Sequence, residues 1–251
     1  MRESGSRSGD ANVIVRDLLA RAFPGTELRD QKAFTRAGMS PEELVRLYEL
    51  VANQGAASVL EVGMASGTST VVILSALSQS GTGRLTSIDP FQTTQFKGSG
   101  RERVRAMGFS DSHRLLEQPD YLALPQLLAA GESFDFILVD GYHSFDYTLV
   151  DVFYADLLLR SGGVLAVHDS SWPAVLKTLQ FLEAHKDYRR LSPPPLVRRD
   201  SLIEKGLGRL RIYSGGPRRI KAFEDRRRNW HTLAAYRKIS DRMAPEFTLG
   251  F

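Results

Sequence analysis

The chain has 251 residues, of which 42% are hydrophobic and 25% are charged, and its net charge of +4 is mildly basic. This length is enough for one large α/β domain with an appendage, and the composition is that of a globular protein. The lack of cysteine excludes disulfides, thiolate nucleophiles and cysteine-bound zinc, and no apolar run approaches the roughly 20 residues of a membrane span. These features favour a cytoplasmic protein.

The N-terminal region is expected to be a short tail followed by helices. Residues 1–10 are rich in Ser, Gly and Arg, lack the apolar core of a secretory signal peptide, and are expected to be disordered. Apolar residues at helical spacing predict a helix over 12–23. The run Ser-Pro-Glu-Glu at 40–43 is a strong helix start, because the serine can cap the helix and the second glutamate completes a capping box. We therefore assign residues 11–57 to an N-terminal helical segment.

From residue 58 onward, predicted strands and helices alternate. Alternation of this kind predicts a parallel sheet with helices on both faces. The continuous apolar run at 134–139 is typical of a strand that is buried on both faces. The predicted strands are 58–63, 84–88, 113–117, 134–139 and 164–168, and the predicted helices are 67–79, 99–107, 121–130, 145–160 and 173–186.

Beyond residue 187 the alternation weakens. Residues 188–191 and 209–214 are predicted to be two more strands, an antiparallel pair that closes the sheet. Residues 217–243 are predicted to be helical and basic, since 218–238 holds eight Lys or Arg against two acidic residues. A solvated helix face and an attraction to an anionic substrate, a nucleic acid or a membrane surface both explain such a run.

The most informative segment is residues 59–69, where an apolar strand leads into the pattern Glu-x-Gly-x-x-x-Gly. Gly63 and Gly67 permit positive φ and a close approach of the backbone to a ligand. In open α/β sheets ligands bind beyond the carboxyl ends of the strands, which is where this loop falls. Met64 and Ala65 stand where the dinucleotide fingerprint needs a glycine, and no Gly-Lys-Ser/Thr follows. The loop therefore disfavours a dinucleotide and a nucleoside triphosphate.

The Glu-x-Gly-x-x-x-Gly pattern resembles the first motif of class I S-adenosylmethionine-dependent methyltransferases. The resemblance covers residues 40–214 and is closest to the small-molecule O-methyltransferase-like branch labelled methyltransferase domain 24, whose members and relatives act on sugars and other natural-product hydroxyls. It implies a Rossmann-like, doubly wound, mostly parallel seven-stranded sheet in an S-adenosylmethionine-binding domain over 58–214. N-terminal helices would precede this domain, and a basic helical appendage, 215–251, would follow it.

The resemblance also implies roles for acidic residues at successive strand ends. Glu61 would contact or orient the methionine part of S-adenosylmethionine. Asp89 can accept hydrogen bonds from the ribose hydroxyls, although an Asp-Pro pair is also a common turn. Asp120 can accept from the adenine amino group, cap the helix at 121–130, or do both. The expected cofactor-binding residues are Glu61, Gly63, Ala65, Gly67, Asp89, Asp120 and Asp140.

A second constellation of Asp140, His143, His168 and Asp169 ends the fourth and fifth predicted strands. Neighbouring strand ends bring these groups to one edge of the crevice, and such a cluster is better explained by proton transfer or a metal than by stability. His143 is the candidate general base for an acceptor hydroxyl, with Asp140 and Asp169 as further catalytic residues. A turn role for Asp140 and a core position for His168 are the alternatives.

The resemblance makes part of this constellation a candidate metal site. Metal-dependent members of related O-methyltransferase families place ligands at the fourth strand end and at two adjacent positions ending the fifth. The corresponding residues here are Asp140, His168 and Asp169. Relatives usually have a carboxylate in place of the histidine, and magnesium prefers oxygen ligands. Manganese or zinc would therefore suit the site better than magnesium.

These features predict a methyltransferase that transfers a methyl group from S-adenosylmethionine to the oxygen of a small molecule or sugar. An RNA acceptor is an alternative that the basic stretch suggests, but the sequence has neither an aromatic-interleaved basic module nor an asparagine-proline catalytic signature. A non-catalytic methyltransferase-like binding protein is a further alternative. Some of the loop aromatics Phe91, Tyr142, Phe145 and Trp172 are expected to face the acceptor. The sequence leaves the acceptor, the metal and the oligomeric state open, a homo-oligomer included.

Overall fold

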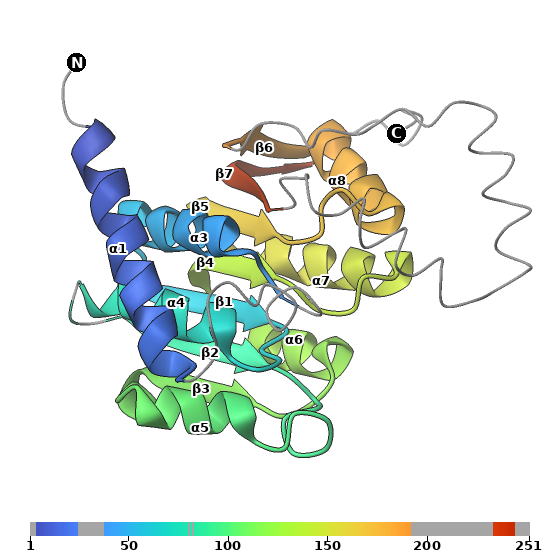
Figure 1. The fold of residues 1–251 in the computed structure, drawn as a ribbon. Coiled ribbons are helices and arrows are strands. Elements are labelled where there is room, and N and C mark those ends of the chain that lie inside the picture. Colours follow the sequence, from blue (N-terminus) through green and yellow to red (C-terminus); the bar gives the residue numbers. More distant parts are fainter. Residues whose placement is uncertain (1–3, 25–37, 80, 82, 192–232, 244–251) are drawn as a thin grey trace, which may run out of the picture.

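A twisted seven-stranded sheet organises the chain, with helices packed on both of its faces (Figure 1). The computed structural model describes residues 4–24, 38–79, 81, 83–191 and 233–243. The strands are β1 (Ser58–Val62), β2 (Arg84–Ile88), β3 (His113–Leu116), β4 (Phe134–Val139), β5 (Leu159–Val167), β6 (Lys186–Arg190) and β7 (Ala234–Met243).

The order of the strands across the sheet is β3-β2-β1-β4-β5-β7-β6. Strands β1 to β5 run parallel to one another, and β7 lies antiparallel between β5 and β6. This arrangement confirms the predicted α/β class with a doubly wound, mostly parallel seven-stranded sheet. The strand order reverses direction at β1, so the loops after β1 and β4 flank the switch point at which such sheets bind ligands.

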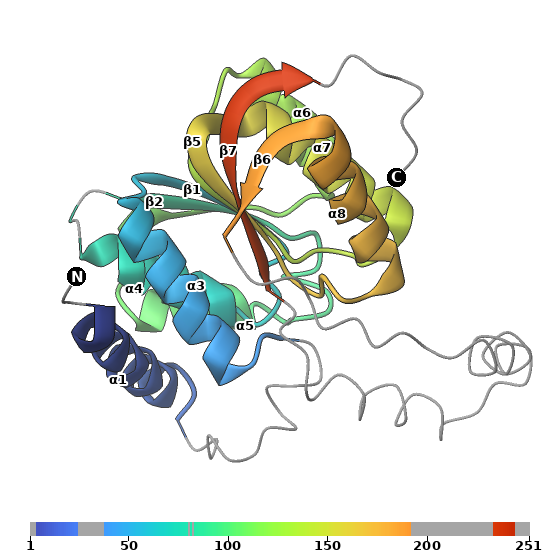
Figure 2. The same ribbon diagram turned by 90° about the horizontal axis from the view of Figure 1, so that it is seen from above.

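The helices form two layers, one on each face of the sheet. Figure 2 shows α3, α4 and α5 on one face, with α1 outside them, and α6, α7 and α8 on the other. The helices are α1 (Ser4–Ala22), α3 (Pro41–Gln54), α4 (Thr68–Ser78), α5 (Ser99–Ala106), α6 (Asp120–Ala129), α7 (Phe145–Leu158) and α8 (Pro173–His185), and a single 3-10 turn lies at Ser110–Ser112.

Strand β1 places apolar side chains on both faces of the sheet, because each face supports its own core. In β1, Val59 packs into the core beneath α3 and α4, whereas Leu60 and Val62 pack into the core beneath α6, α7 and α8. All three side chains are buried. Burying one such side chain contributes roughly 1.5–3 kcal/mol, so the two cores together hold β1 and its loop in place.

The start of α3 confirms the predicted capping box. Ser40 Oγ accepts a hydrogen bond from the backbone N–H of Glu43 at 3.3 Å, and Glu43 Oε2 accepts one from the backbone N–H of Ser40 at 2.9 Å. The helix ends at Gly55, whose φ of +62° is the left-handed conformation that glycine adopts without strain. These local signals place the N-terminus of α3 next to the sheet edge described below.

Strand β7 corrects the prediction for the C-terminal region. The sequence favoured a helix at 217–243 and a closing strand at 209–214, but residues 234–243 form a strand between β5 and β6. Residues 209–214 and the rest of the basic appendage lie outside the described residues. Alanine at positions 234 and 235 favours a helix locally, but both residues are buried between two strands, and tertiary pairing overrides that preference.

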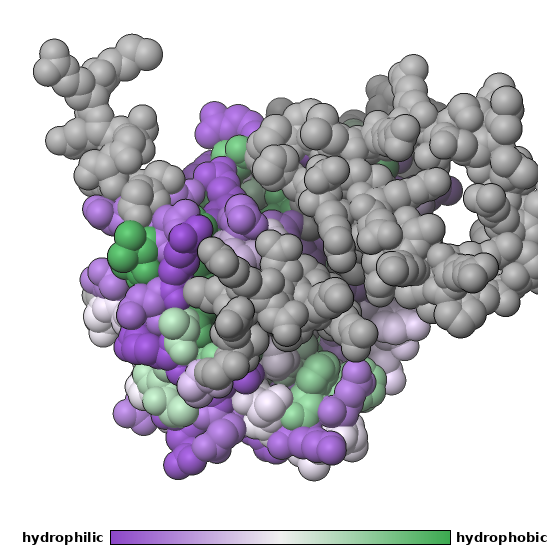
Figure 3. Space-filling model, viewed as in Figure 1, coloured by the Kyte–Doolittle hydropathy of each residue, from purple (hydrophilic) through white to green (hydrophobic). Residues whose placement is uncertain are grey.

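The N-terminal expectation also needs correction. Residues 4–10 were expected in a disordered tail, yet they form the first turns of α1. The apolar-periodic segment at 12–23 packs against α3, and a helix that is already nucleated extends at little cost into flanking residues. No helix in the described part of the chain combines the length and the hydropathy that crossing a membrane demands. On the face shown in Figure 3, hydrophilic residues separate small hydrophobic areas.

Candidate cofactor and catalytic site

The carboxyl ends of four neighbouring strands meet at one edge of the sheet. Val62 at the end of β1 pairs with Ile88 of β2 and with Val139 of β4, and Val139 in turn pairs with Val167 of β5. The next residues along the chain therefore lie side by side: Gly63, Asp89, Asp140 and His168. The sequence predicted that these strand ends lie at one edge of the sheet, and the register of the strands confirms it.

The glycine loop after β1 packs tightly against its surroundings. Gly63 has φ of +92°, and a β-carbon at this position would lie 2.1 Å from the carbonyl oxygen of Asp140. Gly67 has φ of +82°, and a β-carbon there would lie 3.1 Å from the Cα of Gly100 in α5. Ala65 also has positive φ, at +47°. Gly67 begins α4 without a side-chain cap, so the first N–H groups of this helix suit an anionic ligand.

Asp89 closes on the glycine loop from the end of β2. Its Oδ2 accepts hydrogen bonds from the backbone N–H groups of Met64 at 3.2 Å and Ala65 at 2.6 Å, and from Gln92 Nε2 at 3.2 Å. Its Oδ1 accepts from the backbone N–H of Phe91 at 2.7 Å. A carboxylate has about four lone-pair sites, so ribose hydroxyls would replace some of these bonds. The ribose role of Asp89 stays a prediction.

Glu61 is fully buried and holds three elements together. Its oxygens accept hydrogen bonds from Ser69 Oγ at 2.5 Å and Thr70 Oγ1 at 2.7 Å in α4, and from Ser87 Oγ at 2.7 Å in β2. Burial raises the pKa of Glu61 to about 7, although these hydroxyls stabilise its charged form. These hydrogen bonds join β1 to α4 and β2, and a role of Glu61 towards the methionine part of the cofactor stays a prediction.

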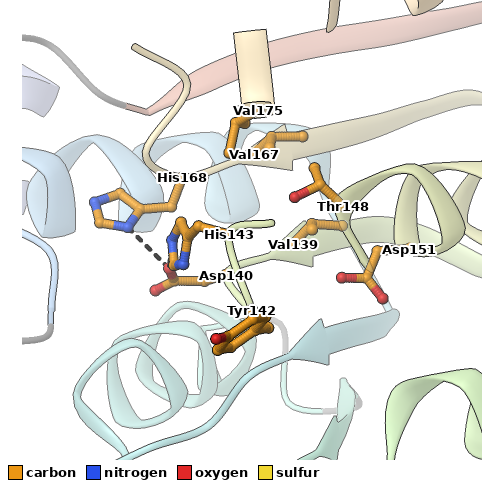
Figure 4. A pocket seen from close by; sticks show the side chains of 10 residues that line it. Val139, Asp140, Tyr142, His143, Thr148, Asp151, Val167, His168 and Val175 are labelled. Atoms are coloured by element: carbon orange, nitrogen blue, oxygen red, sulfur yellow. Dashed lines mark hydrogen bonds and ion pairs between the residues drawn. The ribbon is translucent and has the colours of Figure 1, made fainter. Parts of the chain in front are cut away.

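The predicted catalytic groups converge in the structure. His168 Nδ1 lies 2.8 Å from Asp140 Oδ1, the hydrogen bond drawn in Figure 4. His143 Nε2 lies 2.9 Å from Asp169 Oδ2 and 3.5 Å from Asp140 Oδ1. Asp169 has φ of +51°, an uncommon value for a residue with a side chain, and such strain is frequent at functional sites.

Charge governs the protonation of this cluster. Burial alone would raise the pKa of Asp140, but the two histidines outweigh burial and lower it. Burial would lower the pKa of His143, but Asp140 and Asp169 raise it to about 9. Burial would likewise lower the pKa of His168, and the surrounding carboxylates raise it well above its ordinary value. The carboxylates around the two imidazoles therefore favour the protonated form of both.

Glu43 belongs to the site although the sequence pointed only to its capping role. Its Oε2 lies 3.5 Å from His168 Nε2, so His168 contacts a carboxylate at each ring nitrogen. The same oxygen accepts the capping hydrogen bond from Ser40. The N-terminus of α3 therefore contacts the candidate catalytic cluster. Only the folded chain reveals this contact, because Glu43 and His168 are far apart in the sequence.

The residues that could hold a metal differ in part from the predicted set. Asp140, His143 and His168 each offer a ligand atom, and these atoms lie within 4.8 Å of one another. Asp169, predicted as a ligand, lies outside this group of three. A site with two imidazoles and one carboxylate suits manganese or zinc better than magnesium.

A small pocket opens beside the cluster, at the ends of β4 and β5. Figure 4 shows His143 and His168 turned towards Asp140, with Asp151 on the side of α7. Asp151 and Thr148 were not among the predicted site residues, and their positions within a helical pattern gave no signal. The pocket is lined by Val139, Asp140, Gly141, Tyr142, His143, Thr148, Asp151, Val167, His168 and Val175.

The aromatic residues expected near the acceptor differ in their exposure. Tyr142 is 68% exposed, and Phe91 and Phe145 are also exposed. The ring of Trp172 lies 5.3 Å from that of His143, centroid to centroid, so it packs on the candidate base. Tyr142 is the aromatic residue of this group that both lines the pocket and faces solvent.

Asp120 is the first residue of α6, beyond β3. Its Oδ1 accepts a hydrogen bond from the backbone N–H of Tyr121 at 2.7 Å, and its side chain is buried. Pro119 is the N-cap of α6 and no side chain caps the helix, so the expected capping role of Asp120 is wrong. Asp120 lies within the first turn, where the helix dipole favours its negative charge. Adenine binding by Asp120 stays a prediction.

Comparison with known proteins agrees with the fold. Residues 60–170 match the family model of a methyltransferase domain, the branch that the sequence had suggested. No curated protein matches the sequence significantly.

Solved structures with the same fold include several methyltransferases. An O-methyltransferase from Bacillus cereus with S-adenosylhomocysteine aligns with a TM-score of 0.58 and 17% identity, over 75% of this chain and 92% of its own. The cofactor-bound Rv0187 from MTB aligns with a TM-score of 0.60 and 18% identity, over 90% and 96%. The O-methyltransferase TomG of Streptomyces achromogenes, solved with S-adenosylmethionine, aligns with a TM-score of 0.58 and 19% identity, over 78% and 92%.

The glycine loop, the strand order and the matched segment agree with one another. Residues 60–170 are therefore a methyltransferase domain, and the chain has the fold of the class I S-adenosylmethionine-dependent methyltransferases.

Proposed function

We propose that the protein transfers a methyl group from S-adenosylmethionine to a hydroxyl of a small molecule or sugar. The observation that carries this proposal is the position of His143, which lies between Asp140 and Asp169 one strand away from the glycine loop. A histidine held by carboxylates is a suitable proton acceptor. O-Methyltransferases among the structures of the same fold support the choice of oxygen as the acceptor atom.

The residues around the glycine loop fit S-adenosylmethionine. The uncapped N-terminus of α4 suits the methionine carboxylate, Asp89 the ribose hydroxyls and Asp120 the adenine amino group. When bound, the cofactor supplies a methyl group on a positively charged sulfur. Transfer is an in-line displacement, so the protein contributes mainly by positioning the two reactants and removing the acceptor proton.

In the proposed reaction, His143 Nε2 keeps its proton, directed towards Asp169, and Nδ1 accepts the proton of the acceptor hydroxyl. The cofactor would supply the methyl group to the acceptor oxygen, and the electron pair of its carbon–sulfur bond would stay on sulfur. The two carboxylates stabilise the imidazolium that results. His168 and Glu43 position Asp140 and link α3 to the base.

A divalent cation is a second means of activating the hydroxyl at the same place. Asp140, His143 and His168 would hold it, and the ion would lower the pKa of a bound hydroxyl. Asp169 would support His143 from outside the coordination sphere. Adding and chelating manganese, zinc and magnesium in an activity assay distinguishes this arrangement from a metal-free base.

The proposal is tested by binding first and by transfer second. Isothermal titration of the full chain with S-adenosylhomocysteine should show stoichiometric binding, and the absence of binding would contradict the proposal. Methyl transfer from labelled S-adenosylmethionine is then measured on sugars, phenols and other hydroxyl compounds. Transfer should depend on His143, whereas a protein that only binds the cofactor transfers nothing to any of these acceptors.

A further inference from the structure

Asp151 is a buried acid that the proposed reaction does not use. It lies on α7, is 1% exposed, and lines the pocket beneath the turn that joins β4 to α7 (Figure 4). Among the residues that the structure describes, no donor makes a hydrogen bond to either of its carboxylate oxygens. A charged carboxylate in such a position would be unstable, since neither water nor a donor would compensate its burial.

The group that faces Asp151 is another acid, Asp120 of α6. A β-carbon placed on Gly141 would lie 3.2 Å from Asp151 Oδ2 and 3.9 Å from Asp120 Oδ2, so the two carboxyl groups share the space under this turn. Burial and the charge of Asp120 raise the pKa of Asp151 well above its ordinary value. Two carboxyl groups hydrogen-bond to each other only when one of them carries a proton.

The surroundings indicate which of the two acids carries the proton. Asp120 receives a backbone N–H bond from Tyr121 and lies at the N-terminus of α6, where the helix dipole favours negative charge. Asp151 has no such support within the described structure, and the other charged group that acts on it is His143, which lowers its pKa less than Asp120 raises it. The proton therefore belongs on Asp151, and Asp120 accepts its hydrogen bond.

We propose that Asp151 is a positioning residue for the adenine ring of the cofactor. Its neutral carboxyl donates a hydrogen bond to Asp120 and fixes that side chain as the acceptor for the adenine amino group. Gly141 makes the arrangement possible, because a side chain there would crowd Asp151 Oδ2 and Val62. This inference rests on the proposed use of S-adenosylmethionine. It explains how the site would discriminate adenine from purines that lack the amino group.

The test compares two ligands that differ only at this amino group, S-adenosylhomocysteine and S-inosylhomocysteine, by isothermal titration with the full chain. The wild type should prefer the adenosyl ligand. Asp151→Leu should reduce that preference by about tenfold, because Asp120 loses the donor that holds it. Asp151→Asn should keep the preference, since the amide N–H replaces the acid proton. Asp120→Asn should lose the preference, because its amide can present a donor to the adenine amino group.

Asp146→Asn is the matched control. Asp146 lies on the first turn of the same helix but is exposed, so its replacement should leave the preference unchanged. An unchanged preference in Asp151→Leu would overturn the inference, as would an equal loss in Asp151→Asn. If the wild type binds neither ligand, the proposed function fails and the inference fails with it. If the wild type binds both ligands and only the effect of Asp151 is missing, the proposed function stands.

An infrared measurement keeps the inference testable if Asp151→Leu does not fold. Replacement by asparagine preserves shape and neutrality, so Asp151→Asn should fold. The difference spectrum between the wild type and Asp151→Asn at neutral pH should contain the carbonyl band of a protonated carboxylic acid. The corresponding spectrum for Asp146→Asn should contain a carboxylate band instead. A carboxylate band in both spectra would place no proton on Asp151 and overturn the inference.

Discussion

The carbonyl oxygen of Asp140 lies 2.1 Å from the position that a β-carbon on Gly63 would occupy. The end of β4, which carries Asp140 and leads to His143, is thus in close contact with the loop expected to hold the cofactor. The two parts are joined further by a hydrogen bond of 2.8 Å from the N–H of Asp140 to the carbonyl of Val62. Close backbone packing therefore holds the glycine loop and the end of β4 in one relative position.

Replacing Gly63 with alanine should strongly destabilise the protein. The new β-carbon would meet the Asp140 carbonyl, and the φ of +92° is already unfavourable for a residue with a side chain. We expect the free energy of unfolding to fall by at least about 3 kcal/mol, measured by urea denaturation.

Gly131→Ala is the control, because Gly131 has φ of +72° but no described atom lies within 4 Å of the position that its β-carbon would take. Backbone strain alone should then cost about 1–2 kcal/mol. Equal decreases in the free energy of unfolding of the two variants would show that the backbone around Gly63 and Asp140 shifts to accommodate the new β-carbon at little cost.

Asp89→Ala should weaken the binding of S-adenosylhomocysteine by about tenfold or more, because a charged acceptor is lost from the ribose site and from the glycine loop. Titration calorimetry measures the change. Asp111→Ala, at an exposed position in the 3-10 turn, should bind like the wild type. Wild-type affinity in Asp89→Ala would refute the ribose role.

The pH dependence of stability should report on Glu61. Its pKa is raised from 4.5 to about 7, so between these values the folded state binds more protons than the unfolded state. Stability linked to this group therefore falls as pH rises from 4.5 to 7 and is constant above that. Glu61→Gln removes the fall, which amounts to about 3 kcal/mol for a shift of this size.

Urea denaturation at pH 5 and pH 8 measures this effect. From pH 5 to pH 8 the free energy of unfolding of Glu61→Gln should rise relative to that of the wild type. Glu42→Gln, at an exposed position in α3, should show the same pH dependence as the wild type. A pH dependence in Glu61→Gln identical to that of the wild type would show that Glu61 is already ionised at pH 5.

Two substitutions of Glu43 should separate its capping role from its charge. Glutamine also completes a capping box, so Glu43→Gln should retain most of the stability, whereas Glu43→Ala should lose about 1 kcal/mol. Both variants remove the negative charge near His168 Nε2 and should lower the pKa of His168.

Imidazole NMR titration measures that pKa directly. The raised pKa means that the charge of His168 stabilises the folded state fully below pH 6.5, and that this stabilisation is lost as pH rises through the folded-state value. Unchanged titration of His168 in both variants would show that Glu43 does not act on it electrostatically.

His143→Ala should reduce kcat by about a hundredfold or more while leaving the affinity for S-adenosylhomocysteine within a fewfold of the wild type. Because the pKa of His143 is about 9, the fraction of the unprotonated base grows as pH rises towards 9. The wild-type kcat/KM should increase over that range, and the variant should lose the increase. The same pH profile in both proteins would assign the base to another group.

Some of the candidate site was predictable because parallel strands align their carboxyl ends. Gly63, Asp89, Asp140 and His168 each follow a strand directly, and the topology of an alternating α/β chain places such positions side by side. The capping box of α3 was also predictable, since all its atoms come from four consecutive residues. Short-range patterns of this kind can be recognised in the sequence without knowledge of the tertiary structure.

The contacts that were missed join distant segments. Glu43 reaches His168 across α3 and β5, and Asp151 meets Asp120 across α7 and α6. Strand β7 enters the sheet between β5 and β6, although its alanines favour a helix and its basic residues suggested an exposed face. Lys238 shows why that inference failed: it is 2% exposed and donates to the carbonyls of Asp156 and Leu159.

Periodicity and turn chemistry act over a few residues, so they were enough to predict the fold class, the glycine loop and the strand ends that carry acidic groups and histidines. The contacts of those groups, and the shifts of their pKa values, depend on how distant segments pack together. A carboxyl such as Glu61 or Asp151 changes its pKa through burial and through neighbours that packing supplies, and neither is a property of the local chain.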